Sequence, residues 1–203
     1  MENIDVKEIP IRLVQSAGDT FLSRITSMLN YFLNPISTRY CNTNIKEYCK
    51  DSGSYLKEPY RWKYHTPCGK ECCIVAGDVK SLYPSLARKL VKTALEDALK
   101  ISSFFSEKAE RIMTKLTMYC LENILLEFQN NLYVQDKGVI TGDNDSVAIA
   151  NIALHFIIKQ ITEIPNNCII FKLYIDDILF ITAGQRGAEI VRNALRNKFK
   201  EYV

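Results

Sequence analysis

Apolar residues recur at two different spacings along the chain, and the two spacings predict different elements. In five segments they return every three or four positions, which is the spacing of one face of an α-helix. These segments are residues 20–33, 85–101, 106–128, 147–161 and 185–202. Short runs of β-branched and aromatic residues predict strands instead, because such side chains suit a pleated, half-buried surface. These runs lie at residues 10–16, 74–78, 131–135 and 169–181.

Several residues mark where these helices should begin and end. Asn34-Pro35 is expected to end the first helix, because the residue before a proline avoids the helical conformation. Ser85 is expected to cap the second helix, and Asp145 or Ser146 the fourth. Side chains of these types accept hydrogen bonds from the free N–H groups of a helix start.

The last apolar run is interrupted by two adjacent carboxylates, Asp176 and Asp177. Apolar residues on both sides predict a β-hairpin with the acidic pair at its turn. Aspartate is common in turns because its short side chain bonds the nearby backbone. Taken alone, the pair is explained equally well as an ordinary solvated turn.

A third carboxylate, Asp78, stands where the apolar run of residues 74–78 ends. The run predicts a buried strand, which places Asp78 at a strand end. A strand-end carboxylate near the hairpin pair would form a cluster of like charges, which is costly unless cations fill it. Two Mg²⁺ or Mn²⁺ ions about 3.5–4 Å apart could then hold the attacking and leaving oxygens of a phosphoryl transfer.

These acidic residues resemble the motifs of a known family. The stretch Tyr174-Ile175-Asp176-Asp177 is similar to the Tyr-x-Asp-Asp signature of reverse transcriptases. Asp78, with Tyr83 five residues later, resembles the first aspartate motif of the same polymerases. The spelling Asp-Val-x-Ser-Leu-Tyr around Asp78 is most like that of Penelope-like retroelements.

A third motif lies between the other two. The segment with Gln135, Gly138 and Gly142 resembles the template-and-primer segment of the family, with these residues at matching spacing. All three motifs occur in the family's order, and the resemblance covers about residues 11–182.

The resemblance implies an α+β fold, the right-hand polymerase palm, in which helices pack on one face of an antiparallel sheet. Residues 1–70 would form partial fingers and the connection to the palm, residues 71–203 would form the palm, and the thumb would be absent. The implied activity is that of an RNA-directed DNA polymerase, which extends a DNA primer on an RNA or DNA template from deoxynucleoside triphosphates. The parent's thumb and a possible endonuclease segment would be missing partners.

The resemblance also implies a role for each matching residue. Asp78, Asp176 and Asp177 would be catalytic and would bind two Mg²⁺ or Mn²⁺ ions. Tyr83 would be a steric gate, since a flat ring against the sugar leaves no room for a 2′-hydroxyl. The expected nucleotide-binding residues are Arg12, Val79, Tyr83, Gln135 and Gly142. The expected template and primer contacts are Gly138 and Tyr174.

Two other functions remain open at this point. A DNA-templated family-B polymerase also uses an Asp-x-x-Ser-Leu-Tyr motif, but it would be expected to carry Tyr-x-Asp-Thr-Asp rather than Tyr174-Ile175-Asp176-Asp177. The other alternative is a truncated, non-catalytic retroelement remnant that acts at most as a nucleic-acid-binding module.

Composition adds limits rather than a function. The 203 residues suffice for one domain with a sizeable core, and the net charge of +3 allows a nucleic-acid partner without requiring one. No apolar run approaches the roughly 20 residues of a membrane span, so no membrane partner is expected. The start of the chain lacks a signal-peptide pattern, which favours an intracellular location, nuclear or cytoplasmic. Seven cysteines, an odd number, favour free thiols over a disulfide framework or a zinc site.

Overall fold

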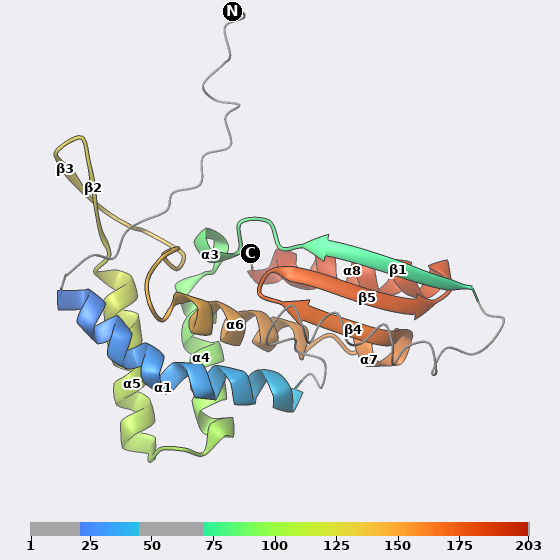
Figure 1. Ribbon diagram of the computed structural model, residues 1–203, viewed down its shortest axis with the longest axis horizontal. Coiled ribbons are helices and arrows are strands. Elements are labelled where there is room, and N and C mark those ends of the chain that lie inside the picture. Colours follow the sequence, from blue (N-terminus) through green and yellow to red (C-terminus); the bar gives the residue numbers. More distant parts are fainter. Residues whose placement is uncertain (1–20, 45–70, 203) are drawn as a thin grey trace, which may run out of the picture.

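The computed structural model describes residues 21–44 and 71–202, which form a helical block beside a three-stranded sheet (Figure 1). Residues 1–20, 45–70 and 203 lie outside this description, and the predicted strand at residues 10–16 falls among them. The elements, in chain order, are α1 (Phe21–Asn44), β1 (Cys72–Asp78), α3 (Leu82–Ser85), α4 (Arg88–Ser102), α5 (Glu107–Glu122), β2 (Leu125–Phe128), β3 (Asn131–Val134), α6 (Ser146–Ile158), α7 (Glu163–Asn167), β4 (Cys168–Tyr174), β5 (Asp177–Ala183) and α8 (Gln185–Tyr202).

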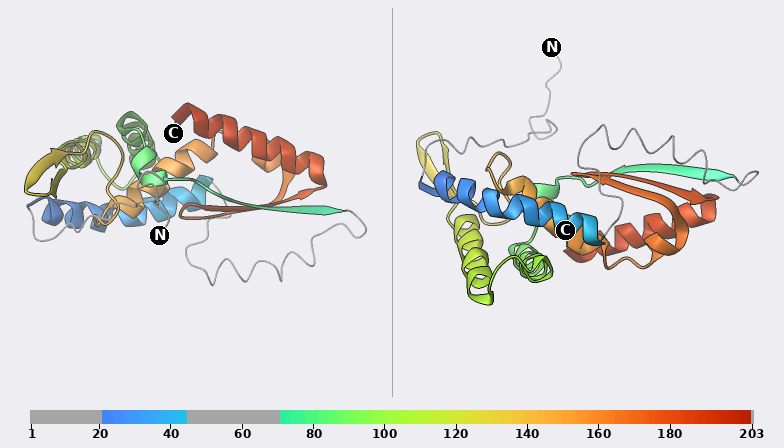
Figure 2. Two further views of the ribbon diagram at one scale, coloured as in Figure 1. Left: turned by 90° about the horizontal axis from the view of Figure 1, so that it is seen from above. Right: turned by 60° about the horizontal axis from the view of Figure 1, so that its bottom comes forward.

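The sheet is antiparallel throughout, with the strand order β1-β5-β4. Helix α8 packs against all three strands, on the face seen uppermost in the left panel of Figure 2. Because β4 and β5 are joined by a tight turn and β1 pairs with β5, the end of β1 meets that turn. The predicted α+β fold, an antiparallel sheet with packed helices, is confirmed.

Helix α6 is the centre of the helical block. Its own side chains are apolar on nearly every face, which is typical of a fully buried helix. It packs against α1 and α4, and its residues Ile149 and Leu154 are almost inaccessible to solvent. None of the described helices combines the length and apolar character that a membrane span needs.

The predicted end of the first helix at Pro35 is wrong. Helix α1 continues through Pro35 to Asn44. A proline inside a helix costs about 3 kcal/mol, since it removes one hydrogen bond and crowds the preceding turn. Ile36 and Tyr40 lie beyond it and are fully buried, and burial of each such side chain stabilises by roughly 1.5–3 kcal/mol. Packing therefore outweighs the local cost.

The predicted helix over residues 106–128 is too long. Helix α5 ends at Glu122, and the following residues form a hairpin of β2 and β3 that projects from the block (Figure 1). Its turn residues Gln129 and Asn130 both have positive φ, the backbone of a tight two-residue hairpin turn. The predicted strand at residues 131–135 is confirmed as β3.

Two smaller expectations also differ from the structure. β1 lies at the sheet edge and most of its side chains are partly or fully exposed, so the predicted buried strand is wrong. Ser85 is the last residue of α3, and Ala87 stands at the start of α4, so Ser85 does not cap that helix.

Candidate active site

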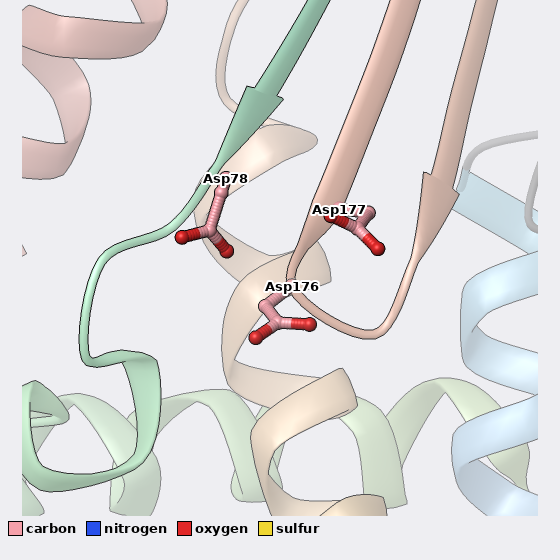
Figure 3. A group of neighbouring side chains, drawn as sticks. All are labelled: Asp78, Asp176 and Asp177. Atoms are coloured by element: carbon pink, nitrogen blue, oxygen red, sulfur yellow. The ribbon is translucent and has the colours of Figure 1, made fainter. Parts of the chain in front are cut away.

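Three carboxylates meet where β1 ends and the β4–β5 turn begins. Asp78, the last residue of β1, lies opposite Asp177, the first residue of β5, and Asp176 is in the turn. One carboxylate oxygen from each of the three residues lies within 4.8 Å of the others (Figure 3). The strand pairing thus brings together residues that are almost a hundred positions apart.

Backbone contacts hold this arrangement in place. The Val79 N–H donates to the Asp176 carbonyl at 3.1 Å, which ties the chain after β1 to the turn. Ile175, the other turn residue, has a φ of 53°, a conformation that is strained for a β-branched side chain. Such strain costs of order 1–3 kcal/mol and concentrates at functional sites. The turn keeps its shape against a local energetic preference.

The charges of the cluster are not balanced within the described part of the chain. Asp78 and Asp177 are exposed and Asp176 is half-buried. Within the described residues, 21–44 and 71–202, no salt bridge involves any of these three carboxylates. Two like charges about 4 Å apart repel by roughly 1–4 kcal/mol near a protein surface. An all-carboxylate donor set fits a hard divalent cation such as Mg²⁺ or Mn²⁺.

Tyr83, the predicted steric gate, lies close to this cluster. It belongs to the short helix α3 and is half-buried. Burial raises the pKa of its hydroxyl, and the nearby charge of Asp176 raises it further. The ring therefore presents a neutral phenol beside the carboxylates.

The predicted template-and-primer segment packs against the same helix. The Val139 N–H donates to the Tyr83 carbonyl at 2.8 Å. A Cβ at Gly138 would lie 2.6 Å from the Pro84 carbonyl oxygen, so the close approach that requires a glycine here is to the protein's own backbone. Gln135 is half-buried directly after β3, where its side-chain amide donates to the Lys137 carbonyl at 2.8 Å.

The remaining predicted residues are placed as follows. Gly142 is exposed and has a φ of 114°, and Tyr174 ends β4 opposite Asp177, half-buried. Val79 is buried beside the acidic turn. Arg12 lies outside the described residues.

Sequence reasoning missed two groups that support this region. The Arg88 guanidinium donates to the Gln135 carbonyl. Thr26 on α1 donates to the Asp143 carboxylate at 2.6 Å, and the Asn144 side-chain amide donates to the Ser27 hydroxyl at 2.7 Å. No local pattern could have indicated these contacts, because the partners are 47 and 117 residues apart.

A groove of about 370 Å³ runs between β1 and α8 and includes Asp78 in its wall. Val75 and Phe180 form part of its apolar lining. The basic side chains along it are those of Lys80, Arg192 and Arg196. Positive charge therefore lies on the flank of the acidic cluster without pairing with it in the described structure.

Comparison with known proteins identifies the fold. No protein-family model matches the chain, and no curated protein matches it. Telomerase from Candida albicans, solved with a TWJ fragment of telomeric RNA, matches with a TM-score of 0.66 at 16% identity, over 89% of this chain and 33% of that chain. Apo telomerase from Candida tropicalis matches with a TM-score of 0.67 at 13% identity, over 89% and 35% respectively. The chain spans about a third of the length of these relatives of reverse transcriptases. The fold of this chain is thus polymerase palm-like, similar to part of these telomerase structures.

Proposed function

We propose that this chain is the catalytic palm of an RNA-directed DNA polymerase, which extends a DNA primer by two-metal nucleotidyl transfer. The observation that carries the proposal is the convergence of Asp78, Asp176 and Asp177 at one end of a palm-like sheet. Carboxylates at this spacing, with no cation of their own, suit divalent ions that also bind phosphate.

Each residue has a defined part in this reaction. Asp78 and Asp176 would hold both ions, and Asp177 would support them less directly. The ions, when bound, would neutralise the charge that develops on the attacking and leaving oxygens. The primer 3′ oxygen forms a bond to the α-phosphorus of the nucleotide as the bond to pyrophosphate breaks. The residues of the chain would therefore position the ions and the reacting groups rather than react covalently.

Nucleotide and template would be held by the groups around the cluster. The ring of Tyr83 would stand against the sugar and exclude a 2′-hydroxyl, which favours deoxynucleotides. Gln135, Gly138, Gly142 and Tyr174 would lie near the template, the primer and the incoming base. An RNA partner is supported by the telomerase neighbours, two of which were solved with a TWJ fragment of telomeric RNA.

The proposal extends to a larger protein. The matched telomerase chains are about two and a half times as long as this one, and we propose that a thumb and further segments of a larger polymerase are needed for processive synthesis. Origin from a retroelement of the Penelope-like branch is proposed on the sequence around Asp78 alone.

Primer extension tests the proposal. The chain, and a version extended through the parent's thumb, are assayed on matched RNA and DNA templates with Mg²⁺ or Mn²⁺. We expect RNA-templated synthesis that Asp176→Asn abolishes and that Glu107→Gln, an exposed change on α5, leaves intact. Retention of synthesis by Asp176→Asn would overturn the mechanism.

A second outcome would favour the non-catalytic alternative. If neither version extends a primer but the chain binds Mn²⁺, and Asp78→Asn abolishes that binding, the acidic cluster is a metal site in a nucleic-acid-binding remnant. If no metal binds, the three-carboxylate interpretation is wrong.

A further inference from the structure

We infer that Arg88 and Gly138 are positioning residues for Tyr83, because they fasten residues 135–139 to the backbone that carries this ring. We call this contact the gate bracket, made of residues 135–139 on one side and residues 83–88 on the other. The inference about position stands on the contacts alone, whereas its consequence for sugar selection rests on the proposed polymerase function.

The first contact of the gate bracket is a backbone hydrogen bond. The Val139 N–H donates to the Tyr83 carbonyl at 2.8 Å, and Val139 is almost fully buried. A buried N–H that loses its acceptor costs about 1–3 kcal/mol. The Tyr83 backbone therefore cannot move away without a large penalty.

The second contact is a backbone approach that only glycine permits. A Cβ at Gly138 would lie 2.6 Å from the carbonyl oxygen of Pro84 and 2.7 Å from its Cα. Atoms this close must shift, and both partners are backbone rather than flexible side chains. Gly138 also has a φ of +83°, where other residues are strained. Residues 135–139 can thus lie directly on the residue that follows Tyr83.

The third contact ties the two sides of the gate bracket together at its other end. Arg88 begins α4, only five positions after Tyr83, and its guanidinium donates to the Gln135 carbonyl. The Arg88 Nε is buried and, in the described structure, has no hydrogen-bond partner. A buried N–H left unpaired lowers stability, so an arginine here is not explained by stability alone.

These contacts decide where the ring stands relative to the carboxylates. On one side of α3, the Val79–Asp176 hydrogen bond fixes the chain to the acidic turn. On the other side, the gate bracket fixes the Tyr83 backbone itself. The ring is therefore held near Asp176 before any ligand arrives. A steric gate depends on such pre-organisation, because a displacement of about 1 Å can cost a hundredfold in a reaction that relies on positioning.

Gly138→Ala is the first test, and Gly184→Ala is its matched control. Gly184 has nearly the same φ, +82°, but a Cβ there would meet nothing within 4 Å. Both changes introduce the same backbone strain, and only Gly138→Ala also forces the gate bracket apart. We expect hydrogen exchange of the Val139 amide to accelerate about tenfold or more in Gly138→Ala, since exchange reports the opening of that bond. Gly184→Ala should leave this amide protected.

The functional readout is the ratio of kcat/KM for deoxy- and ribonucleoside triphosphates in primer extension. Gly138→Ala should lower this ratio about tenfold by improving use of the ribonucleotide, because a displaced ring no longer excludes the 2′-hydroxyl. Gly184→Ala should leave the ratio unchanged.

Two changes at Arg88 provide an independent test. Arg88→Met keeps an unbranched apolar stem but removes the donors, whereas Arg88→Lys keeps one donor group and the charge. We expect faster Val139 exchange and a lower ratio in Arg88→Met, with Arg88→Lys closer to the parent. This graded rescue would not follow from a general loss of packing. If Gly138→Ala fails to fold by circular dichroism, the Arg88 pair decides.

The outcomes separate this inference from the proposed function. If the chain without substitutions does not extend primers but Gly138→Ala or Arg88→Met still exposes the Val139 amide, the gate bracket is supported and the proposed polymerase function is wrong. If the Val139 amide stays protected in both variants, the gate bracket is wrong. If the amide opens but the parent's sugar discrimination persists in both variants, the role in positioning the ring is overturned.

Discussion

The helical block and the end of the sheet differ in how their carboxylates are paired: Asp97 in the block has a basic partner, whereas the three carboxylates at the sheet end have none among the described residues. In the block, Asp97 on α4 accepts a hydrogen bond of 2.5 Å from the Tyr40 hydroxyl and a salt bridge from Lys159. Burial and Asp97 together raise the pKa of Tyr40, so this hydroxyl stays protonated and donates. The chain itself neutralises this carboxylate and uses it to join α1, α4 and α6.

At the end of the sheet, no described side chain plays the part of Lys159. Asp78, Asp176 and Asp177 repel one another, and Ile175 adds backbone strain to the same turn. Backbone strain persists only where the surrounding structure holds it, and it concentrates at active sites and ligand-binding positions. The contrast teaches that the block's charges serve folding, whereas those of the sheet end are available to a bound cation.

Asp145, at the start of α6, is a third case, a buried carboxyl group without a basic partner among the described residues. It is 3% exposed, and burial, with the charge of Asp143, raises its pKa to about 7. Cys120, whose own pKa is raised to about 11 chiefly by burial, feels the same two carboxylates. Asp145 therefore avoids its burial penalty by holding a proton. The carboxylates of this chain thus fall into three groups: paired with a basic side chain, protonated, or unpaired among the described residues and free to bind a cation.

The largest expected effect comes from removing one charge at the sheet end. Asp78→Asn should reduce primer extension about a thousandfold or more, because the proposed metal site would lose one of its three carboxylates. In metal-free buffer it should leave the free energy of unfolding unchanged or raise it, because like-charge repulsion falls. Extension assays and denaturant titration measure the two effects. A marked loss of stability without metal would show that Asp78 serves folding, and the contrast with Asp97 would fail.

The next effect concerns pH and Asp145. The folded state binds this proton up to about pH 7, whereas an unfolded aspartate releases it near its ordinary pKa of 3.8. The contribution of Asp145 to the free energy of unfolding should therefore fall as pH rises between these values, by up to about 1.4 kcal/mol per pH unit. Asp145→Asn should remove this contribution and be the more stable form above pH 7. Urea titrations of both forms across this range measure the difference between their slopes.

His155 supplies the internal control for that experiment. Burial lowers the pKa of His155 to about 4, from an ordinary value of 6.5, so the folded state keeps it neutral. Its contribution is present above pH 6.5 and is lost as pH falls toward 4, which is the opposite slope. Asp145→Asn should unmask this rise of stability with pH. A flat profile in that variant between about pH 4 and 6.5 would contradict the assignment of His155.

Features of the fold and the site could be predicted from the sequence where neighbouring residues determine them, and not where residues far apart in the sequence do. The β4–β5 hairpin was predictable because its strands and the Asp176–Asp177 pair occupy one short stretch with a strong local pattern. The position of Asp78 at a strand end was predictable for the same reason. That the two regions meet followed from the resemblance, and strand pairing provides the physical cause.

Two of the misses involve distant parts of the chain, and a third comes from a local pattern that continues past the end of its element. Helix α1 passes Pro35 because Tyr40 and its neighbours are buried against α4 and α6, which no local pattern reveals. Strand β2 was missed because the apolar spacing of α5 continues through Leu125, where the chain has already left the helix. Arg88 offers no sequence signal, because its acceptor is a backbone carbonyl 47 residues away.

A smaller effect is expected from breaking the paired carboxylate of the block. Asp97→Ala leaves the Tyr40 hydroxyl and the Lys159 ammonium without this acceptor and should destabilise the fold by about 1–3 kcal/mol. Glu107→Gln is the control, since it breaks an exposed salt bridge with Arg111 and should change stability by less than about 1 kcal/mol. Denaturant midpoints compare the two. Equal effects would mean that Asp97 contributes no more than a surface pair.

The smallest expected effect is stabilisation of the parent chain by the ion itself. A ligand that binds only the folded state stabilises it by about 1.4 kcal/mol when its concentration is ten times the Kd. Mg²⁺ or Mn²⁺ should therefore raise the Tm of the parent by a few degrees, and Asp78→Asn should abolish the shift while Asp97→Ala, although less stable, retains it. This result would distinguish the two kinds of carboxylate. Asp97→Ala would lower the stability of the fold but keep its response to metal, whereas Asp78→Asn would keep the stability but abolish the response. An equal metal response in both variants would place the ion elsewhere and remove the basis of the contrast.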